Sequence, residues 1–135
     1  MRVKRIVYSV LLAGALMFCF GTTAFASENW AGITAVLKAN QSTVTTGFSA
    51  DKVFLATAMY GETASNSEYS VMYETRGCNS IGGQTYREAL ITLRPGYSNR
   101  STINSRYNYH SLTLTGKNGL DTVKGCIGYG YVDMD

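Results

Sequence analysis

The sequence contains only one histidine and one proline among its 135 residues, and each shortage narrows the range of functions. With a single histidine, the chain cannot build the multi-histidine sites that hold catalytic zinc. A single proline, Pro95, leaves no proline-rich linker that would divide the chain into domains. The motifs of nucleophile elbows, phosphate-binding loops, dinucleotide-binding turns and zinc proteases are also absent. These absences favour a single domain that is not an enzyme and uses no cofactor.

The longest apolar run lies near the N-terminus, within residues 1–26. It follows three basic side chains, those of Arg2, Lys4 and Arg5. Ala24 and Ala26 then provide small side chains at the positions that a signal peptidase reads. The run of about 15 residues is shorter than the roughly 20 that span a membrane. We therefore predict a signal peptide that is cleaved near Ala26-Ser27, and a secreted protein whose mature chain does not insert stably into a membrane.

Charge is balanced once this segment is set aside. The whole chain has 12 basic and 9 acidic residues, and three of the basic ones lie before residue 6. The 9 basic and 9 acidic residues that remain make residues 27–135 formally neutral. A neutral domain lacks the positive field that draws proteins to nucleic acid or anionic lipid. We therefore expect neither as a partner.

Two cysteines, Cys78 and Cys126, remain after the predicted cleavage. In an exported protein, an even number of cysteines most simply forms disulfides. A Cys78–Cys126 bond would close a loop of about 48 residues and would stabilise the fold by roughly 4 kcal/mol in a chain-entropy estimate. Free thiols are one alternative. A zinc site that adds His110 and Asp133 is another, although structural zinc ligands are usually paired closely in sequence.

Short alternating runs rich in threonine, valine and tyrosine recur through residues 27–135. They cover 33–40, 42–50, 52–60, 67–75 and 89–94, and turn-forming residues at 61–67, 76–84 and 95–101 separate the later ones. Such spacing predicts an all-β fold, a small antiparallel β-sandwich of roughly six to eight strands in a single domain, with a small barrel as the related alternative. A short helix over 84–90 is a disfavoured alternative. The absence of regular strand–helix alternation argues against a parallel α/β fold with a cofactor crevice.

Asn118-Gly119 is the strongest turn signal in the chain, because both residues tolerate positive φ. A two-residue turn here predicts one long hairpin in which Tyr109 lies opposite Gly128. One face of this hairpin, with His110, Tyr129 and Tyr131 among apolar side chains, is then assigned to the core. The other face carries Tyr107 and Tyr109 over the glycines of the last strand. A turn longer by one residue would exchange the two faces.

Tyrosine is abundant, with ten residues in the chain. Its side chain combines a large contact area with a polar tip, so an exposed group would suit contact with a cell-surface protein or glycan. The candidate binding residues are Tyr107, Tyr109, His110, Tyr129 and Tyr131. The competing interpretation, preferred for His110, is that these side chains pack the sandwich. No residue is assigned a catalytic or metal-binding role.

The segments YHSLTL and DTVKGCIGYGYV resemble the C-terminal half of the small β-sandwich lactococcin bacteriocins. The likeness covers residues 110–132, where a His-Ser-x-Thr strand is followed by a polar turn and a glycine-punctuated last strand. It implies a small exported antiparallel sandwich from a Gram-positive bacterium. It also implies, as one possible function, antibacterial action on the cell envelope.

The leading functional hypothesis is a secreted, non-enzymatic protein that acts by surface recognition. A bacteriocin-like antibacterial protein is the first alternative. The second is a cell-wall hydrolase without a recognisable motif, because a pair of carboxylates is enough for glycoside hydrolysis. Its acid–base groups would come from His110 or from the glutamates Glu62, Glu68, Glu74 and Glu88.

Overall fold

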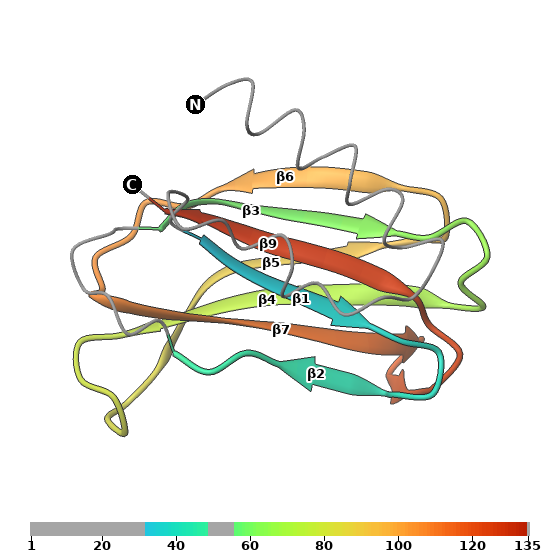
Figure 1. Ribbon diagram of the computed structural model, residues 1–135, viewed down its shortest axis with the longest axis horizontal. Helices are drawn as coiled ribbons and strands as arrows, with labels where there is room; N and C mark the ends of the chain where they lie inside the picture. The colour runs from blue at the N-terminus through green and yellow to red at the C-terminus, as the bar shows by residue number, and fades with distance from the viewer. Residues whose placement is uncertain (1–31, 49–55, 135) are drawn as a thin grey trace.

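The computed structural model describes residues 32–48 and 56–134, and these form two antiparallel β-sheets packed face to face (Figure 1). The strands are β1 (Gly32–Leu37), β2 (Thr43–Thr45), β3 (Ala56–Thr63), β4 (Ser70–Cys78), β5 (Tyr86–Leu93), β6 (Ser98–Thr102), β7 (Tyr109–Asn118), β8 (Asp121–Thr122) and β9 (Gly128–Met134). One sheet has four strands in the order β1-β9-β3-β6. The five-stranded sheet has the order β2-β7-β4-β5, with β8 beside β7.

The predicted all-β sandwich is confirmed, although the described residues form nine strands in place of the roughly six to eight expected. Strand β6 overlaps the segment 95–101 that the sequence predicts to be a turn. The strand was missed because its residues are polar and mostly exposed and show no apolar alternation. The disfavoured helix over 84–90 overlaps strand β5. The predicted signal peptide over 1–26 and the predicted cleavage site lie outside the described residues.

The core between the sheets is organised around Tyr73 of β4, which is fully buried. Its phenol ring lies against the glycines of the four-stranded sheet. A Cβ atom added at Gly61 would lie 2.9 Å from the ring, and one at Gly128 would lie 2.7 Å from the hydroxyl. Contacts this short do not occur between real side chains, so the absence of a side chain at both positions makes room for the tyrosine. The close approach of the two sheets depends on this fit.

The long hairpin predicted from Asn118-Gly119 is wrong. Asn118 pairs with Asp121, so the turn residues are Gly119 and Leu120, one position later than predicted. Pairing ends after two residues of β8, and the chain then crosses to the other sheet, where β9 pairs with β1 and β3. Tyr109 consequently lies opposite Cys78 of β4 and not opposite Gly128. A turn motif specifies only where the chain reverses direction. How far the two strands then stay paired depends on how the apolar faces of both sheets are buried.

The predicted disulfide is not formed, because Cys78 and Cys126 lie at opposite ends of β4. Both thiols are free and buried. Cys78 is the last residue of β4, whereas the Cys126 sulfur lies 3.5 Å from the carbonyl oxygen of Ser70, the first residue. A nine-residue strand holds its two ends roughly 25 Å apart, and disulfides need Cα atoms within about 7 Å.

Candidate functional site

The five predicted binding residues fall into two separate groups. Tyr107, Tyr109 and His110 lie at the beginning of β7 or just before it, in the five-stranded sheet. Tyr129 and Tyr131 lie on β9, in the four-stranded sheet. The structure therefore does not bring the predicted site together, and each group has its own surroundings.

His110 is a buried core residue that contacts Glu88. Its Nδ1 atom lies 2.6 Å from a carboxylate oxygen of Glu88, and the two side chains are only 0% and 3% exposed. A β-bulge explains the contact: Thr75 pairs with Ala89 and Arg76 with Arg87, which leaves Glu88 as an extra residue in β5. A bulge of this kind changes the direction of a side chain, and here the side chain of Glu88 enters the core.

Tyr107 covers this buried pair. A Cβ atom at Gly77 would lie 2.6 Å from the Tyr107 ring and 2.7 Å from the carboxylate of Glu88, so the glycine leaves space for both. The other side of Tyr107 is also occupied, because its ring stacks on Tyr86 at 5.3 Å between centroids and 6° between planes. These contacts give Tyr107 a place in the packing of the five-stranded sheet.

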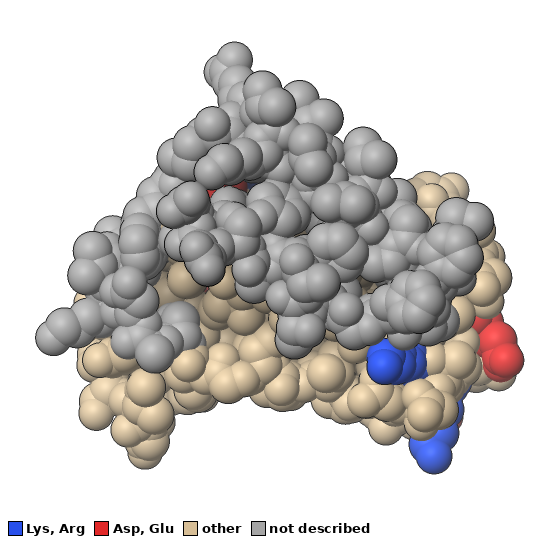
Figure 2. All heavy atoms as spheres, in the orientation of Figure 1, with Lys and Arg blue, Asp and Glu red and all other residues tan. Residues whose placement is uncertain are grey.

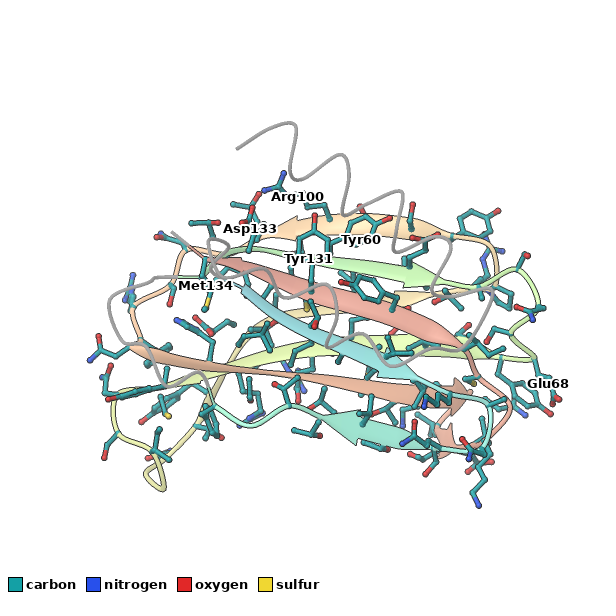
Figure 3. All side chains as sticks on the ribbon, viewed as in Figure 1. Tyr60, Glu68, Arg100, Tyr131, Asp133 and Met134 are labelled. Atoms are coloured by element: carbon teal, nitrogen blue, oxygen red, sulfur yellow. The ribbon has the colours of Figure 1, made fainter. Side chains whose placement is uncertain are left out.

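The four glutamates considered for hydrolysis are not gathered into one site. Glu88 is in the core and Glu62 is on the four-stranded sheet. Glu74 pairs with Arg87 at 2.7 Å, and it projects from the opposite face of β4 to the core residue Tyr73. Glu68 lies at the far end of the sandwich from Arg100 and Asp133 (Figure 3). The four glutamates therefore lie on different faces and at different ends of the sandwich.

The second group belongs to a cluster of three tyrosines on the outer face of the four-stranded sheet. Gly128 and Gly130 point toward the core, so the alternating residues Tyr129 and Tyr131 point away from it. This corrects the sequence-based assignment of both tyrosines to the core face of a hairpin. Tyr60 of β3 lies directly opposite Tyr131, with ring centroids 5.1 Å apart (Figure 3).

We call Tyr60, Tyr129 and Tyr131 the tyrosine platform. Tyr131 lies between the other two, with its ring centroid 6.3 Å from that of Tyr129. Tyr129 is buried, whereas Tyr60 and Tyr131 are partly exposed. The rings of Tyr60 and Tyr131 pack against each other, with centroids 5.1 Å apart and planes tilted by 31°.

Charged side chains border the tyrosine platform. Tyr60 donates a hydrogen bond of 3.2 Å to the carboxylate of Glu62. On the other side, Arg100 of the edge strand β6 reaches Asp133 at 3.4 Å. Arg100 stands opposite Tyr60, and Asp133 is on β9, so the arginine side chain crosses β3 near the small residue Ala58. The platform is thus bordered by hydrogen-bond acceptors and by a guanidinium donor.

Burial of the platform changes the acidity of its phenols. Burial, and secondly the nearby carboxylate of Glu62, raise the pKa of Tyr60 above its ordinary value. Burial also raises the pKa of Tyr129 strongly, with a smaller contribution from Tyr131. Both hydroxyl groups therefore stay protonated at neutral pH and can donate hydrogen bonds.

Tyr60 and Arg100 were not among the residues predicted from the sequence, and Glu62 was considered only as an acid–base group for hydrolysis. The alternation Tyr60-Gly61-Glu62 does place the tyrosine and the glutamate on one face of a strand. The pairing of β3 with β9 joins segments about 70 residues apart in the chain, and strand patterns do not encode such partners. The sequence therefore indicated that Tyr60 and Glu62 share a face, but it did not indicate which residues of other strands lie beside them.

The described ranges show neither a cluster of metal-ligand side chains nor a membrane-spanning helix. Residues 32–48 and 56–134 contain no group of three or more His, Cys, Asp or Glu side chains arranged to hold a metal ion. The same ranges contain no helix that is long and apolar enough to cross a membrane. In Figure 2, the described part of the visible face is mostly uncharged, with basic and acidic side chains near one end.

Comparison with known proteins identifies the structural class of the fold. No family model and no curated protein matches the chain. Among solved structures, the crystal structure of PirA is similar, with a TM-score of 0.53 and 4% sequence identity. The match covers 82% of this chain and 98% of PirA. At such low identity the similarity defines the structural class alone, which is a small all-β sandwich of two packed antiparallel sheets.

Proposed function

We propose that this chain is an exported, non-enzymatic recognition protein that binds a cell-surface ligand through the tyrosine platform. The observation that supports this proposal is the grouping of Tyr60 and Tyr131 on an outward face, partly exposed and bordered by Glu62 and Arg100. Tyrosine provides large contact area with few rotatable bonds, which is why it dominates many binding surfaces.

The two outer faces of the sandwich differ in a way that supports this proposal. The outer face of the five-stranded sheet carries mostly short or charged side chains, including Thr45 and Thr113, whose hydroxyls are 3.0 Å apart, together with Met72, Leu90 and Tyr109. That composition is typical of a sheet face in water. Solvent alone gives no reason for three large aromatic side chains to gather on the corresponding face of the four-stranded sheet, whereas a binding partner does.

Variants that change residues on one outer face of the sandwich test the proposal through their binding to cells. The double substitution Tyr60→Ser and Tyr131→Ser should lower binding to intact Gram-positive cells at least tenfold, because each aromatic anchor in an interface contributes at least about 1 kcal/mol. The matched control changes Thr45→Ala and Thr113→Ala on the opposite face and should bind normally. Unchanged binding by the tyrosine variant, with both proteins folded by circular dichroism, would refute the proposal.

Antibacterial action at the cell envelope, which the lactococcin resemblance implies, stays a separate proposal. Binding to the envelope would be its first step, so the same tyrosine variant is informative. If the protein is antibacterial, the wild type should clear a lawn of related bacteria and the variant should not. A protein that binds cells without clearing any lawn would be a recognition protein alone.

A further inference from the structure

The turn between β7 and β8 contains an asparagine that is followed directly by a glycine. Asn118-Gly119 is the only such pair in the 135-residue chain. We infer that Asn118 is a modification site, at which spontaneous deamidation converts the side-chain amide to a carboxylate. The chemistry of the pair, its exposure and the short pairing of β8 each support this assignment.

The glycine permits the reaction because it has no side chain. In the first step, the backbone nitrogen of Gly119 bonds to the side-chain carbonyl carbon of Asn118. The bond from that carbon to the amide nitrogen breaks, solvent carries a proton from the backbone nitrogen to the leaving group, and ammonia leaves. Water then opens the cyclic imide and gives aspartate or isoaspartate. A Cβ atom on residue 119 would hinder the attack, and glycine has none.

Both residues are accessible to solvent. Asn118 and Gly119 are exposed, and the next residue of the turn, Leu120, is 96% exposed. Within residues 32–48 and 56–134, the Asn118 side chain forms no hydrogen bond and no acceptor binds the Gly119 amide. A Cβ atom added at Gly119 would have no atom within 4 Å, so the fold does not crowd the turn. Neither reacting group is therefore held away from the other by a tertiary contact.

The strand that closes the turn is short enough to open. Strand β8 has two residues, Asp121 and Thr122, and both are exposed. Their partners on β7 are Asn118 and Lys117. The attack requires the backbone of Asn118 to leave its strand conformation, and the loss of two residue pairs provides that freedom. Exposed hairpin ends with few buried contacts open at low free energy.

The product changes both the charge and the pairing of the turn. Residues 27–135 carry 9 basic and 9 acidic residues, so one new carboxylate gives this neutral chain a net negative charge. An aspartate at position 118 faces Asp121 directly, and like charges in opposed positions weaken a strand pair. Isoaspartate also adds a methylene group to the backbone, which shifts the register of β8. Either product should release β8 from β7.

The release should stay local, because the segment after β8 has its own hydrogen bonds. The amide of Val123 donates to the carbonyl oxygen of Gly116 at 3.0 Å. The amide of Gly125 donates to the carbonyl oxygen of Ala39 at 2.8 Å. Both bonds lie outside the β7–β8 ladder, so the two packed sheets should persist after the modification.

Ageing of the purified protein in mildly alkaline buffer tests the inference, because base removes the proton from the attacking nitrogen. Anion-exchange chromatography should separate an acidic isoform, and peptide mass mapping should locate the change at Asn118. The reaction should be at least about tenfold faster there than at Asn66, an exposed turn asparagine whose following residue, Ser67, carries a Cβ atom. The substitution Asn118→Ser should remove this isoform, whereas the matched control Asn66→Ser should not.

Amide hydrogen exchange measures whether the modification releases β8. Residues 117–122 should exchange at least about tenfold faster in the acidic isoform, while β9 keeps its protection and the circular dichroism spectrum is unchanged. Equal reaction rates at Asn118 and Asn66, or an acidic isoform that persists in Asn118→Ser, would overturn the assigned site. Unchanged exchange over 117–122 in the acidic isoform would overturn the release of β8.

Discussion

Removing the hydroxyl of Tyr73 tests how the sandwich is held together. The substitution Tyr73→Phe keeps the ring, which occupies the space above Gly61 and Gly128. It removes a hydrogen bond of 2.6 Å to the carbonyl oxygen of Glu62 and a contact of 2.9 Å with the hydroxyl of Thr63. One buried hydrogen bond contributes about 0.5–1.5 kcal/mol, and an unpaired buried acceptor adds to the loss. We expect the free energy of unfolding at pH 7 to fall by about 1.5 kcal/mol.

The same substitution should change the alkaline stability in the opposite direction. Burial raises the pKa of Tyr73 far above its ordinary value of 10.0. Above pH 10 the unfolded chain therefore loses this proton while the folded protein keeps it, and the stability falls by about 1.4 kcal/mol per pH unit for each such tyrosine. Phenylalanine has no proton to lose. The difference between the two proteins should therefore shrink above pH 10, vanish near about pH 11 and then reverse.

Urea unfolding followed by circular dichroism at pH 7, 9, 10, 10.5 and 11 measures this crossing. Tyr97→Phe is the matched control for removing a tyrosine hydroxyl, because Tyr97 is 54% exposed. A constant difference between Tyr73→Phe and wild type across the whole range would refute the reasoning. So would an unchanged stability at pH 7, since the hydroxyl would then contribute nothing.

Three further predictions concern the core. Gly61→Ala should lower the free energy of unfolding by about 1–3 kcal/mol in urea, because the new methyl group overlaps the Tyr73 ring. Glu88→Ala should cost about 3–5 kcal/mol in the same assay, because His110 loses its buried carboxylate partner. Cys78 and Cys126 should react with a thiol reagent only after denaturation, since both are buried and free, and the intact mass should show two thiols.

Controls for these experiments come from the same chain. Gly47→Ala adds a methyl group where no atom lies within 4 Å and should be nearly neutral. Glu74→Ala removes two ion pairs whose arginines, Arg76 and Arg87, are 36% and 56% exposed, so its cost should be at most about 1 kcal/mol for each pair. The burial argument would be wrong if Gly61→Ala and Gly47→Ala lowered the free energy of unfolding equally. It would also be wrong if Glu88→Ala and Glu74→Ala did so. An intact mass lower by the two hydrogens of a disulfide would contradict the separation of the cysteines.

Alternation along a strand predicted some of the candidate binding residues but not the face on which they lie. Tyr129 and Tyr131 were recognised as candidate binding residues because tyrosines cluster near the end of the chain. Their face was assigned wrongly, because the hairpin register was extended beyond the turn that specifies it. Glycines opposite phenol rings were also expected, but the ring against Gly128 is Tyr73 of the other sheet and not Tyr109. The predicted cross-strand contact of Tyr109 with Gly128 is therefore wrong, and the observed contact of Tyr73 with Gly128 joins the two sheets.

By itself, the sequence determined the all-β class of this protein, because alternation with a period of two is a local property of neighbouring residues. The signal peptide over 1–26 stays a prediction from the same kind of local pattern. Only the tertiary structure decided that β7 and β9 belong to different sheets, that His110 meets Glu88, and that two cysteines remain apart. Each of these results depends on which strands pair across long sequence separations. That choice is made by burying the faces of both sheets together, and no short segment contains it.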